Sequence, residues 1–292
     1  MSKPLIAVTG KNGQLGWELQ QLHGSYSTAF DFIFTDREEI DLYQPETILS
    51  FFQKYQPQYF INCAAYTAVD KAETEQEKAL KINAETVGII AAACAKINCT
   101  LITISTDYVF DGNGKKPYAA DEKTNPLNYY GYSKWLGEKL ALENCPQSII
   151  IRTSWVYSVH GNNFVKTMLR LMKERNEIKV VNDQTGSPTA AADLAAAILQ
   201  IIEQLSRGNK KYGIYQYSNK GIISWYDFAV AIRSLAGLTC NVLPVPSTEY
   251  PTPAKRPFNS TMDTHKIAQD FHVELIDWQT SLETCIKKLA AA

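Results

Sequence analysis

The sequence feature that most constrains the fold is the alternation of short apolar runs with helical patterns over the first half of the chain. Unbroken apolar runs of this length are typical of parallel strands that are buried on both faces. Helices between such strands form right-handed crossovers and build a doubly wound sheet. The sequence therefore predicts an α/β, Rossmann-like domain over residues 1–152, with strands near residues 5–9, 32–35, 59–62, 100–104 and 148–152.

The pattern becomes less regular after residue 152. Turn clusters interrupt the apolar runs, and residues 245–257 are rich in proline. A proline-rich segment can form neither a regular helix nor a central strand. We therefore expect residues 153–292 to form a smaller, less regular lobe that packs over the first domain, with some segments returning to that domain.

A glycine-rich turn follows the first apolar run. Gly10, Gly13 and Gly16 stand between this run and a helical pattern. Glycines in such a turn let the backbone approach a pyrophosphate, and the helix N-terminus offers free N–H groups. The spacing Gly-x-x-Gly-x-x-Gly differs from the Gly-x-Gly-x-x-Gly of the standard dinucleotide fingerprint. An ordinary strand-to-helix turn is the alternative, but the position in the first βα unit favours nucleotide binding.

Two residues after the second apolar run leave the choice of cofactor open. Asp36 lies about 20 residues after the last glycine, where a carboxylate can bind the ribose hydroxyls of NAD. Arg37 follows at once, and an arginine there can bind the 2′-phosphate of NADP. The sequence thus predicts NADPH or NADH, without a preference between them.

Small and polar residues follow the third and fourth apolar runs. Ala64 and Ala65 come after the third run, and Ser105, Thr106 and Asp107 come after the fourth. The carboxyl ends of parallel strands form the edge at which open α/β sheets bind ligands. Close helix packing for the alanines, and a turn or helix cap for the hydroxyl pair, are the competing interpretations.

Tyr130 and Lys134 lie at the start of a further helical pattern. Their spacing places both side chains on one helix face. A nearby cation favours the phenolate, so we expect Lys134 to lower the pKa of Tyr130 from its usual value of ~10. A tyrosine tuned in this way can act as a general acid near neutral pH. Because Tyr-x-x-x-Lys is a common pattern, an exposed pair on a helix surface is the alternative.

Composition argues against several classes of partner. The 292 residues include 29 Lys or Arg and 30 Asp or Glu, a balance that argues against nucleic-acid binding and against a basic membrane-binding surface. No apolar stretch reaches the ~20 residues of a membrane span, and the N-terminus lacks the pattern of a signal peptide. The six cysteines and four histidines show no metal-ligand spacing. We therefore expect a cytoplasmic protein with free thiols and no metal site.

In chain order, the glycine turn, Thr106 and Tyr130-x-x-x-Lys134 resemble the extended short-chain dehydrogenase/reductase family. Longer stretches narrow the resemblance to its dTDP-4-dehydrorhamnose reductase branch and span nearly the whole chain. One departure is Cys63, where that branch often has alanine. The stretches are residues 62–73 (NCAAYTAVDKAE), 105–112 (STDYVFDG), 183–189 (DQTGSPT) and 255–260 (KRPFNS).

The resemblance implies that a nicotinamide cofactor delivers hydride to C4 of dTDP-4-dehydro-β-L-rhamnose and gives dTDP-L-rhamnose, the last step of dTDP-rhamnose biosynthesis. It implies that Tyr130 protonates the nascent alkoxide, that Lys134 holds the nicotinamide ribose, and that Thr106 hydrogen-bonds the C4 oxygen. It also implies that residues 153–292 mostly bind substrate.

Further residues follow from the same resemblance. The implied substrate contacts are Thr106, Asp107, Trp155 and Arg256. The implied cofactor contacts are Gly10, Asn12, Gly13, Gln14 and Leu15 at the pyrophosphate, Asp36, Arg37, Asp41 and Leu42 at the adenosine end, and Ala64, Ala65, Tyr66, Thr67, Tyr130 and Lys134 along the rest of the cofactor.

Other functions stay open on the sequence. Dehydratases of the superfamily resemble Thr-Asp-Glu at this motif, but the third residue here is Tyr108, so the glutamate is missing. That test does not exclude a sugar-nucleotide 4-epimerase. The non-catalytic regulatory subunit of methionine adenosyltransferase also resembles these reductases, although an intact Thr106, Tyr130 and Lys134 favour catalysis. The sequence does not define the oligomeric state, and it is compatible with a homodimer.

Overall fold

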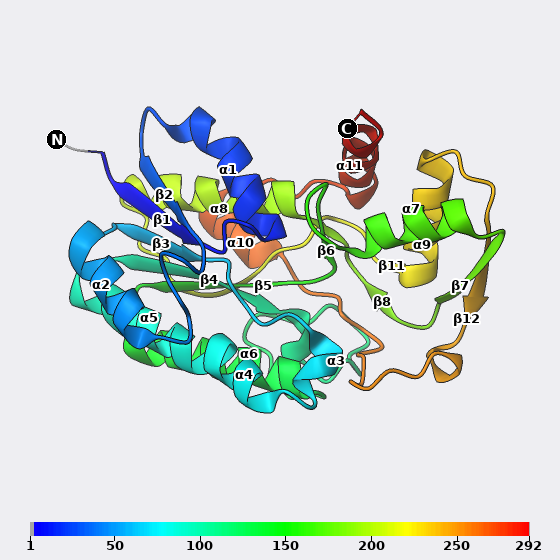
Figure 1. Ribbon diagram of the computed structural model, residues 1–292, viewed down its shortest axis with the longest axis horizontal. Coiled ribbons are helices and arrows are strands. Elements are labelled where there is room, and N and C mark those ends of the chain that lie inside the picture. Colours follow the sequence, from blue (N-terminus) through cyan, green and yellow to red (C-terminus); the bar gives the residue numbers. More distant parts are fainter. Residues whose placement is uncertain (1–2, 292) are drawn as a thin grey trace.

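The computed structural model describes residues 3–291, and a six-stranded sheet lies at the centre of this part of the chain (Figure 1). All strand pairs in it are parallel, in the order β10-β5-β4-β3-β1-β2. The order reverses between β1 and β3, and such a switch point opens a crevice for ligands. The strands are β1 (Leu5–Thr9), β2 (Asp31–Thr35), β3 (Tyr59–Asn62), β4 (Thr100–Thr106), β5 (Ser148–Thr153) and β10 (Gly213–Gln216). The predicted Rossmann-like α/β fold is confirmed.

Helices cover both faces of this sheet, as Figure 1 shows. One face carries α1 (Gln14–Tyr26), α8 (Ala191–Ser206) and α10 (His265–Phe271). The other face carries α2 (Pro45–Tyr55), α4 (Gln76–Leu80), α5 (Thr86–Lys96) and α6 (Tyr129–Asn144), and a short α3 (Val69–Ala72) follows β3.

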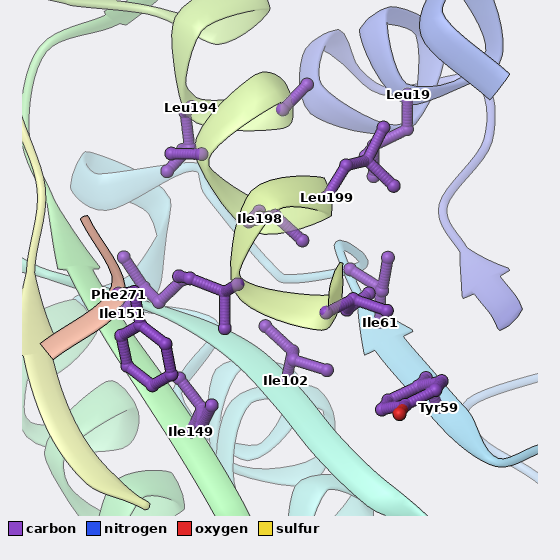
Figure 2. Packing of buried hydrophobic residues seen from close by; sticks show 14 of the residues in the cluster. Leu19, Tyr59, Ile61, Ile102, Ile149, Ile151, Leu194, Ile198, Leu199 and Phe271 are labelled. Carbon is purple, nitrogen blue, oxygen red and sulfur yellow. The ribbon is translucent and has the colours of Figure 1, made fainter. Parts of the chain in front are cut away.

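The core beneath α8 is largely aliphatic (Figure 2). Ile61, Ile102 and Ile149 come from three adjacent strands and pack in one cluster with Ile198 and Leu199 of α8. All five side chains are fully buried. Burial of one such side chain stabilises the fold by ~1.5–3 kcal/mol. Although α8 is distant from the first domain in the sequence, it is therefore an integral part of that domain's core.

The rest of the C-terminal half forms a smaller lobe with a core of its own. Tyr157, Phe228 and Leu282 are buried in that core. The chain leaves the lobe to contribute α8, β10 and α10 to the large sheet layer. The elements of the lobe are β6 (Val156–Tyr157), α7 (Phe164–Glu174), β7 (Glu177–Val181), β8 (Thr185–Gly186), β9 (Thr189–Ala190), β11 (Ile223–Ser224), α9 (Trp225–Leu235), β12 (Asn241–Val245), the 3-10 helix η3 (Ser247–Glu249) and α11 (Trp278–Ala291).

A π-helical segment, η1 (Lys81–Glu85), lies between α4 and α5. Such single π turns are rare in proteins, and those that occur often lie at functional sites. Hydrophobic spacing does not reveal them, because the apolar residues on either side still repeat with a helical period.

Candidate active site

A cavity of about 680 Å³ opens at the carboxyl ends of β1, β3 and β4, beside the start of the smaller lobe. It lies at the sheet edge where the sequence analysis placed the ligand. The predicted site residues that line it are Gly10, Asn12, Gly13, Gln14, Leu15, Ala64, Ala65, Thr67, Thr106, Asp107, Tyr130, Lys134 and Trp155.

The glycine turn brings bare backbone to the cavity wall. Gly10 has a φ of +71°, and a Cβ there would lie 3.0 Å from the Ala64 backbone nitrogen. A Cβ on Gly16 would lie 2.2 Å from the Gly10 carbonyl oxygen, so α1 packs directly on the turn. The N-cap of α1 is Gly13, and no side chain of residues 3–291 caps this helix. Its first N–H groups therefore suit a diphosphate.

Thr106 ends β4 and caps the short 3-10 helix η2 (Asp107–Val109). Its hydroxyl oxygen accepts a hydrogen bond from the Tyr108 N–H at 3.2 Å and donates to Asp107 Oδ1 at 3.0 Å. The hydroxyl also belongs to a residue of the cavity wall. The cap interpretation and the ligand interpretation thus apply to the same side chain.

Tyr130 and Lys134 both line the cavity from the first turns of α6. The N-cap of this helix is Asn128, whose Oδ1 accepts a hydrogen bond from the Gly131 N–H at 2.8 Å. Lys134 is buried, and its Nζ donates to the Ile104 carbonyl oxygen at 2.6 Å. The two side chains are therefore not an exposed pair on a helix surface.

Burial dominates the electrostatics of this pair. It raises the pKa of the Tyr130 phenol above its usual range, and the Asp107 carboxylate adds to the rise. It lowers the pKa of Lys134 to about 8, although Glu138 acts in the opposite direction. The expectation that Lys134 lowers the pKa of Tyr130 is therefore wrong for this structure. Desolvation of the phenolate is the largest cause of the rise, and Lys134 is not among the groups that lower this pKa.

Asp107 is a buried carboxyl at the cavity wall. Its exposed fraction is 3%, and burial raises its pKa to about 6, although the nearby hydroxyls of Ser260 and Thr106 lower it. Oδ1 accepts the hydroxyl proton of Thr106, whereas Oδ2 is buried without a hydrogen-bond partner among residues 3–291. Both protonation states of this carboxyl are therefore accessible near neutral pH.

Close packing fixes the position of α6. A Cβ on Gly131 would lie 2.2 Å from the Tyr108 carbonyl oxygen, so the helix start touches η2. Further along, Glu138 Oε1 and Oε2 accept hydrogen bonds from Arg152 Nε and Nη2 of β5 at 2.8 and 2.7 Å. Both side chains are buried. A two-bond pair of this kind has a fixed geometry and sets the register of α6 against the sheet.

Asn83 is a structural support that the sequence analysis missed. It lies in η1, where its Oδ1 accepts from the Tyr66 N–H at 2.9 Å and its Nδ2 donates to the Tyr66 carbonyl oxygen at 3.0 Å. The same Nδ2 donates to Ser133 Oγ of α6 at 3.0 Å. Asn83 thus joins the loop after β3 to α6. An amide within an otherwise apolar helix face was the one available signal.

The predicted adenosine contacts lie beyond the cavity wall. Asp36 is paired with Lys11, whose Nζ lies 3.0 Å from Oδ2, and it accepts from Asn12 Nδ2 at 3.3 Å. Arg37 is exposed, with Nε 3.7 Å from Asp41 Oδ2. Lys11 was not singled out from the sequence, although it follows Gly10 directly. The predicted residues absent from the wall are Asp36, Arg37, Asp41, Leu42, Tyr66 and Arg256.

Arg256 is held by an acidic partner. Its Nη1 and Nη2 donate to the two carboxylate oxygens of Asp70, each at 2.8 Å. Burial acts to lower the pKa of Arg256, but the pairing with Asp70 helps to raise it, and the same pairing lowers the pKa of Asp70. To bind a phosphate, the guanidinium has to exchange or share this partner.

Two further observations concern metals and membranes. Within residues 3–291, no group of three or more His, Cys, Asp or Glu side chains could hold a metal ion. The helices of the same residues include none with the length and apolar character needed to cross a bilayer.

The doubly wound sheet with a glycine turn in its first βα unit, and a Tyr-x-x-x-Lys pair at the cavity wall beside it, define the short-chain dehydrogenase/reductase class. The chain is 43% identical to a dTDP-4-dehydrorhamnose reductase from Escherichia coli K12, over 97% of each sequence, and a family model described as the RmlD substrate binding domain matches residues 4–291. The chain belongs to the dTDP-4-dehydrorhamnose reductase family.

Solved structures agree with this assignment. A dTDP-4-dehydrorhamnose reductase from Clostridium acetobutylicum has a TM-score of 0.92 and 41% identity, covering 98% of this chain and 99% of the other. The enzyme from Bacillus anthracis, in complex with NADP, has a TM-score of 0.92 and 39% identity, covering 98% of this chain and 100% of the other. A UDP-glucose 4-epimerase from Thermus thermophilus, at 17% identity and a TM-score of 0.78 over 99% of both chains, shares the fold.

Proposed function

We propose that the chain is an enzyme that reduces the C4 keto group of dTDP-4-dehydro-β-L-rhamnose to dTDP-L-rhamnose with NADPH or NADH. This reaction is the final step of dTDP-rhamnose biosynthesis. The observation that carries the proposal is the meeting of Thr106, Tyr130 and Lys134 at one cavity, in a chain whose full-length relatives bear the name of this activity.

Reduction of a ketone adds a hydride to the carbon and a proton to the oxygen. A bound reduced nicotinamide supplies the hydride. Tyr130 supplies the proton, because its raised pKa keeps the phenol protonated at neutral pH and an alkoxide is a far stronger base. Thr106 donates a hydrogen bond to the C4 oxygen and fixes its direction. A donor aimed at developing negative charge can contribute ~3 kcal/mol to the barrier reduction.

Lys134 holds the ribose at the nicotinamide end of the cofactor. One of its three ammonium protons is used by the Ile104 carbonyl oxygen, and the others are free to bind hydroxyls at the cavity wall. The glycine turn holds the diphosphate through Gly10, Gly13 and the uncapped start of α1. Asp36 and Arg37 then face the adenosine ribose.

Trp155 supports the substrate-binding role of the smaller lobe. Its φ is +49°, a backbone conformation that residues other than glycine rarely adopt. Its indole stacks on Trp225 with ring centroids 3.6 Å apart, and a Cβ on Gly186 would lie 2.6 Å from that indole. Strain held in place by such packing is common at functional sites. These contacts support a substrate-binding role for residues 153–292, of which Trp155 lies at the cavity wall. We assign Arg256, which lies outside that wall, to the substrate diphosphate.

The cysteines support a cytoplasmic enzyme. All six are free in the structure, and five of them are buried. Free thiols in such a number are usual in a reducing compartment, whereas secreted proteins form disulfides in oxidising surroundings.

The test is turnover of the authentic keto sugar nucleotide with each reduced cofactor, followed by the loss of nicotinamide absorbance and by identification of the product. Tyr130→Phe should lower kcat by about 10²–10⁴-fold, because the proton donor is lost, while cofactor binding persists. Tyr132→Phe is the matched control, since Tyr132 is 40% exposed on the same helix. It should turn over like the native chain.

The outcomes separate the alternatives. An epimerised product without net loss of reduced cofactor would assign a 4-epimerase instead. A wild-type chain that binds the cofactor and oxidises none of it in the presence of the keto sugar would overturn the proposal. Native turnover by Tyr130→Phe would leave the reaction but remove Tyr130 as its proton donor.

A further inference from the structure

We propose that Asp107 is a positioning residue for Thr106, and that it performs this role in its protonated form. This inference rests on the proposed function, because it concerns how the Thr106 hydroxyl becomes available to the C4 oxygen of the substrate. Asp107 lines the cavity, and its Oδ1 also contacts the catalytic hydroxyl.

The hydrogen bonds of Thr106 define the problem. A threonine hydroxyl has one proton to donate and two lone pairs that accept. One lone pair of Thr106 already accepts from the Tyr108 N–H at 3.2 Å. The contact with Asp107 Oδ1, at 3.0 Å, uses the only proton of the hydroxyl when the carboxyl is ionised, since an ionised carboxylate cannot donate. An ionised Asp107 therefore withholds the donor that the substrate oxygen needs.

Protonation of Asp107 reverses the direction of this contact. A carboxyl proton on Oδ1 is donated to the second lone pair of Thr106 at the same oxygen–oxygen separation. The Thr106 proton is then free to turn to the C4 oxygen, and every lone pair and proton of the hydroxyl has a partner. No bond to carbon is made or broken in this step. A neutral Asp107 also places no negative charge beside the developing alkoxide.

The surroundings of Asp107 make this proton more favourable than at an exposed carboxyl. Tyr130 and Lys134 face the cavity from α6, Tyr108 belongs to the same 3-10 turn, and Ser260 and Arg256 come from the segment after residue 250. The two cations among these groups are engaged elsewhere. Lys134 donates to the Ile104 carbonyl oxygen, and Arg256 is paired with Asp70 through both of its terminal nitrogens. The carboxyl is buried, and burial raises its pKa to about 6.

A pH dependence follows from this arrangement. The fraction of protonated Asp107 falls about tenfold for each pH unit above its pKa, and kcat/KM reports the ionisation of the free enzyme. The kcat/KM of the native chain should therefore fall as pH rises from about 6 toward 8. Lys134, with a pKa of about 8, adds a second fall at higher pH. The two falls have to be separated by substitution.

Asp107→Asn separates them, because an amide Nδ2 donates permanently to the Thr106 oxygen. The ratio of kcat/KM for this variant to that of the native chain should rise about tenfold per pH unit between about pH 6.5 and 8. The ratio cancels the contribution of Lys134, which both proteins share. Thr106→Ser keeps the hydroxyl and should retain the native pH profile. A constant ratio, or an Asn variant that binds cofactor yet is inactive across the range while Thr106→Ser is active, overturns the proposal.

A second measurement does not depend on turnover. The Asp107 carboxyl is followed by infrared or carbon NMR titration, and its signal is assigned by its loss in Asp107→Asn. Thr106→Val removes the donor that stabilises the ionised form, so the titration should move to higher pH. An unchanged titration would show that the two side chains do not share a proton. Absence of NADPH oxidation by the native chain at every pH would instead count against the proposed function.

Discussion

Asp107 at the reactive end of the cavity and Asp36 at the adenosine end are the same residue type with opposite electrostatics. Burial raises the pKa of Asp107 to about 6. At Asp36 the Glu38 N–H and Lys11 hold the pKa at about 2. The Asp107 residue is 3% exposed, whereas the Asp36 side chain is 25% exposed. Desolvation therefore decides the charge at one end, and hydrogen-bonded partners in contact with water decide it at the other.

The difference has a consequence for function. At the reactive end, buried packing fixes the hydrogen-bond partners of each polar group. The protonation state of these groups can therefore change, whereas their partners cannot. At the adenosine end the ion pairs are exposed and screened by salt, so the side chains can exchange partners at little free-energy cost. One end is suited to a single chemistry, and the other can adapt to either form of the cofactor.

The largest expected effect comes from the buried pair that holds α6 at the reactive end. Arg152 is only 2% exposed, and Glu138→Gln leaves its buried guanidinium without a carboxylate partner. Loss of one partner of a buried ion pair costs about 3–5 kcal/mol. Urea unfolding should show a decrease of that size in the free energy of unfolding, with a matching loss of activity near the unfolding midpoint.

The exposed pair of Arg207 and Glu203 is the matched control. Its nitrogen–oxygen distance is 2.6 Å, but the two side chains are 64% and 38% exposed. Glu203→Gln should change the free energy of unfolding by less than about 1 kcal/mol, because water screens the pair. If Glu138→Gln and Glu203→Gln lowered the free energy of unfolding equally, burial would not make the ion pair at the reactive end stronger than an exposed one.

A smaller loss is expected from Gly131→Ala. The added Cβ would meet the Tyr108 carbonyl oxygen at 2.2 Å, and backbone cannot move aside as a flexible side chain can. Overpacking of this kind costs about 1–3 kcal/mol. It should also lower kcat, since Tyr130 precedes the changed residue. Gly24→Ala in α1 meets nothing within 4 Å and should be neutral or stabilising by about 0.5–1 kcal/mol. Thermal unfolding and steady-state rates of both variants provide the measurement.

The sequence predicted the features that follow from the spacing of residues within one strand or helix. It did not predict contacts between residues that are far apart in the chain. The apolar runs placed β1, β3 and β4, and the four-residue spacing placed Tyr130 and Lys134 on one face of α6, since both patterns are properties of single elements. The pairing of Arg256 with Asp70 joins residues 186 positions apart, and no local pattern contains it.

The pKa of Tyr130 shows the same limit. The sequence identified a neighbouring cation, but the sign of the shift depends on how much water the fold removes from the phenol. The π segment that carries Asn83 is a second case, because it inserts into a helix without changing the order of apolar residues. Both are consequences of packing between elements.

Lys134 provides a test of desolvation at the reactive end. Its pKa is about 8 in the folded chain, against ~10.4 when unfolded, so the folded chain binds fewer protons in this window. Stability that depends on Lys134 therefore increases as pH rises through the window. From about pH 7.5 to about pH 9.5, the free energy of unfolding of the native chain should gain about 1–2 kcal/mol relative to Lys134→Met. Urea unfolding at the two pH values measures it.

Lys139→Met is the control for this experiment, because Lys139 is an exposed lysine on the same helix. Its difference from the native chain should stay constant with pH. A constant difference for Lys134→Met as well would mean that the Lys134 ammonium is solvated in the folded protein, and the contrast between the two ends of the cavity would then fail at this residue.

The smallest effect on stability is expected at the adenosine end. Lys11 Nζ lies 3.0 Å from Asp36 and 3.2 Å from Glu39, and Arg37 beside them is 78% exposed. A 2′-phosphate in this region would compete with the two carboxylates for Lys11. Lys11→Met should change the free energy of unfolding by less than about 0.5 kcal/mol, because exposed pairs contribute little. It should weaken NADPH binding by about tenfold, which corresponds to ~1.4 kcal/mol, and leave NADH binding nearly unchanged.

Fluorescence titration of both cofactors at low and high salt measures this prediction. The loss for NADPH should shrink as salt rises, since screening reduces interactions between exposed charges. Lys96→Met, an exposed lysine at the end of α5, should leave both affinities unchanged. An equal loss for NADPH and NADH would place Lys11 at the diphosphate instead. In that case the exposed ion pairs would serve to hold the cofactor, not to let the adenosine end accept two forms of it.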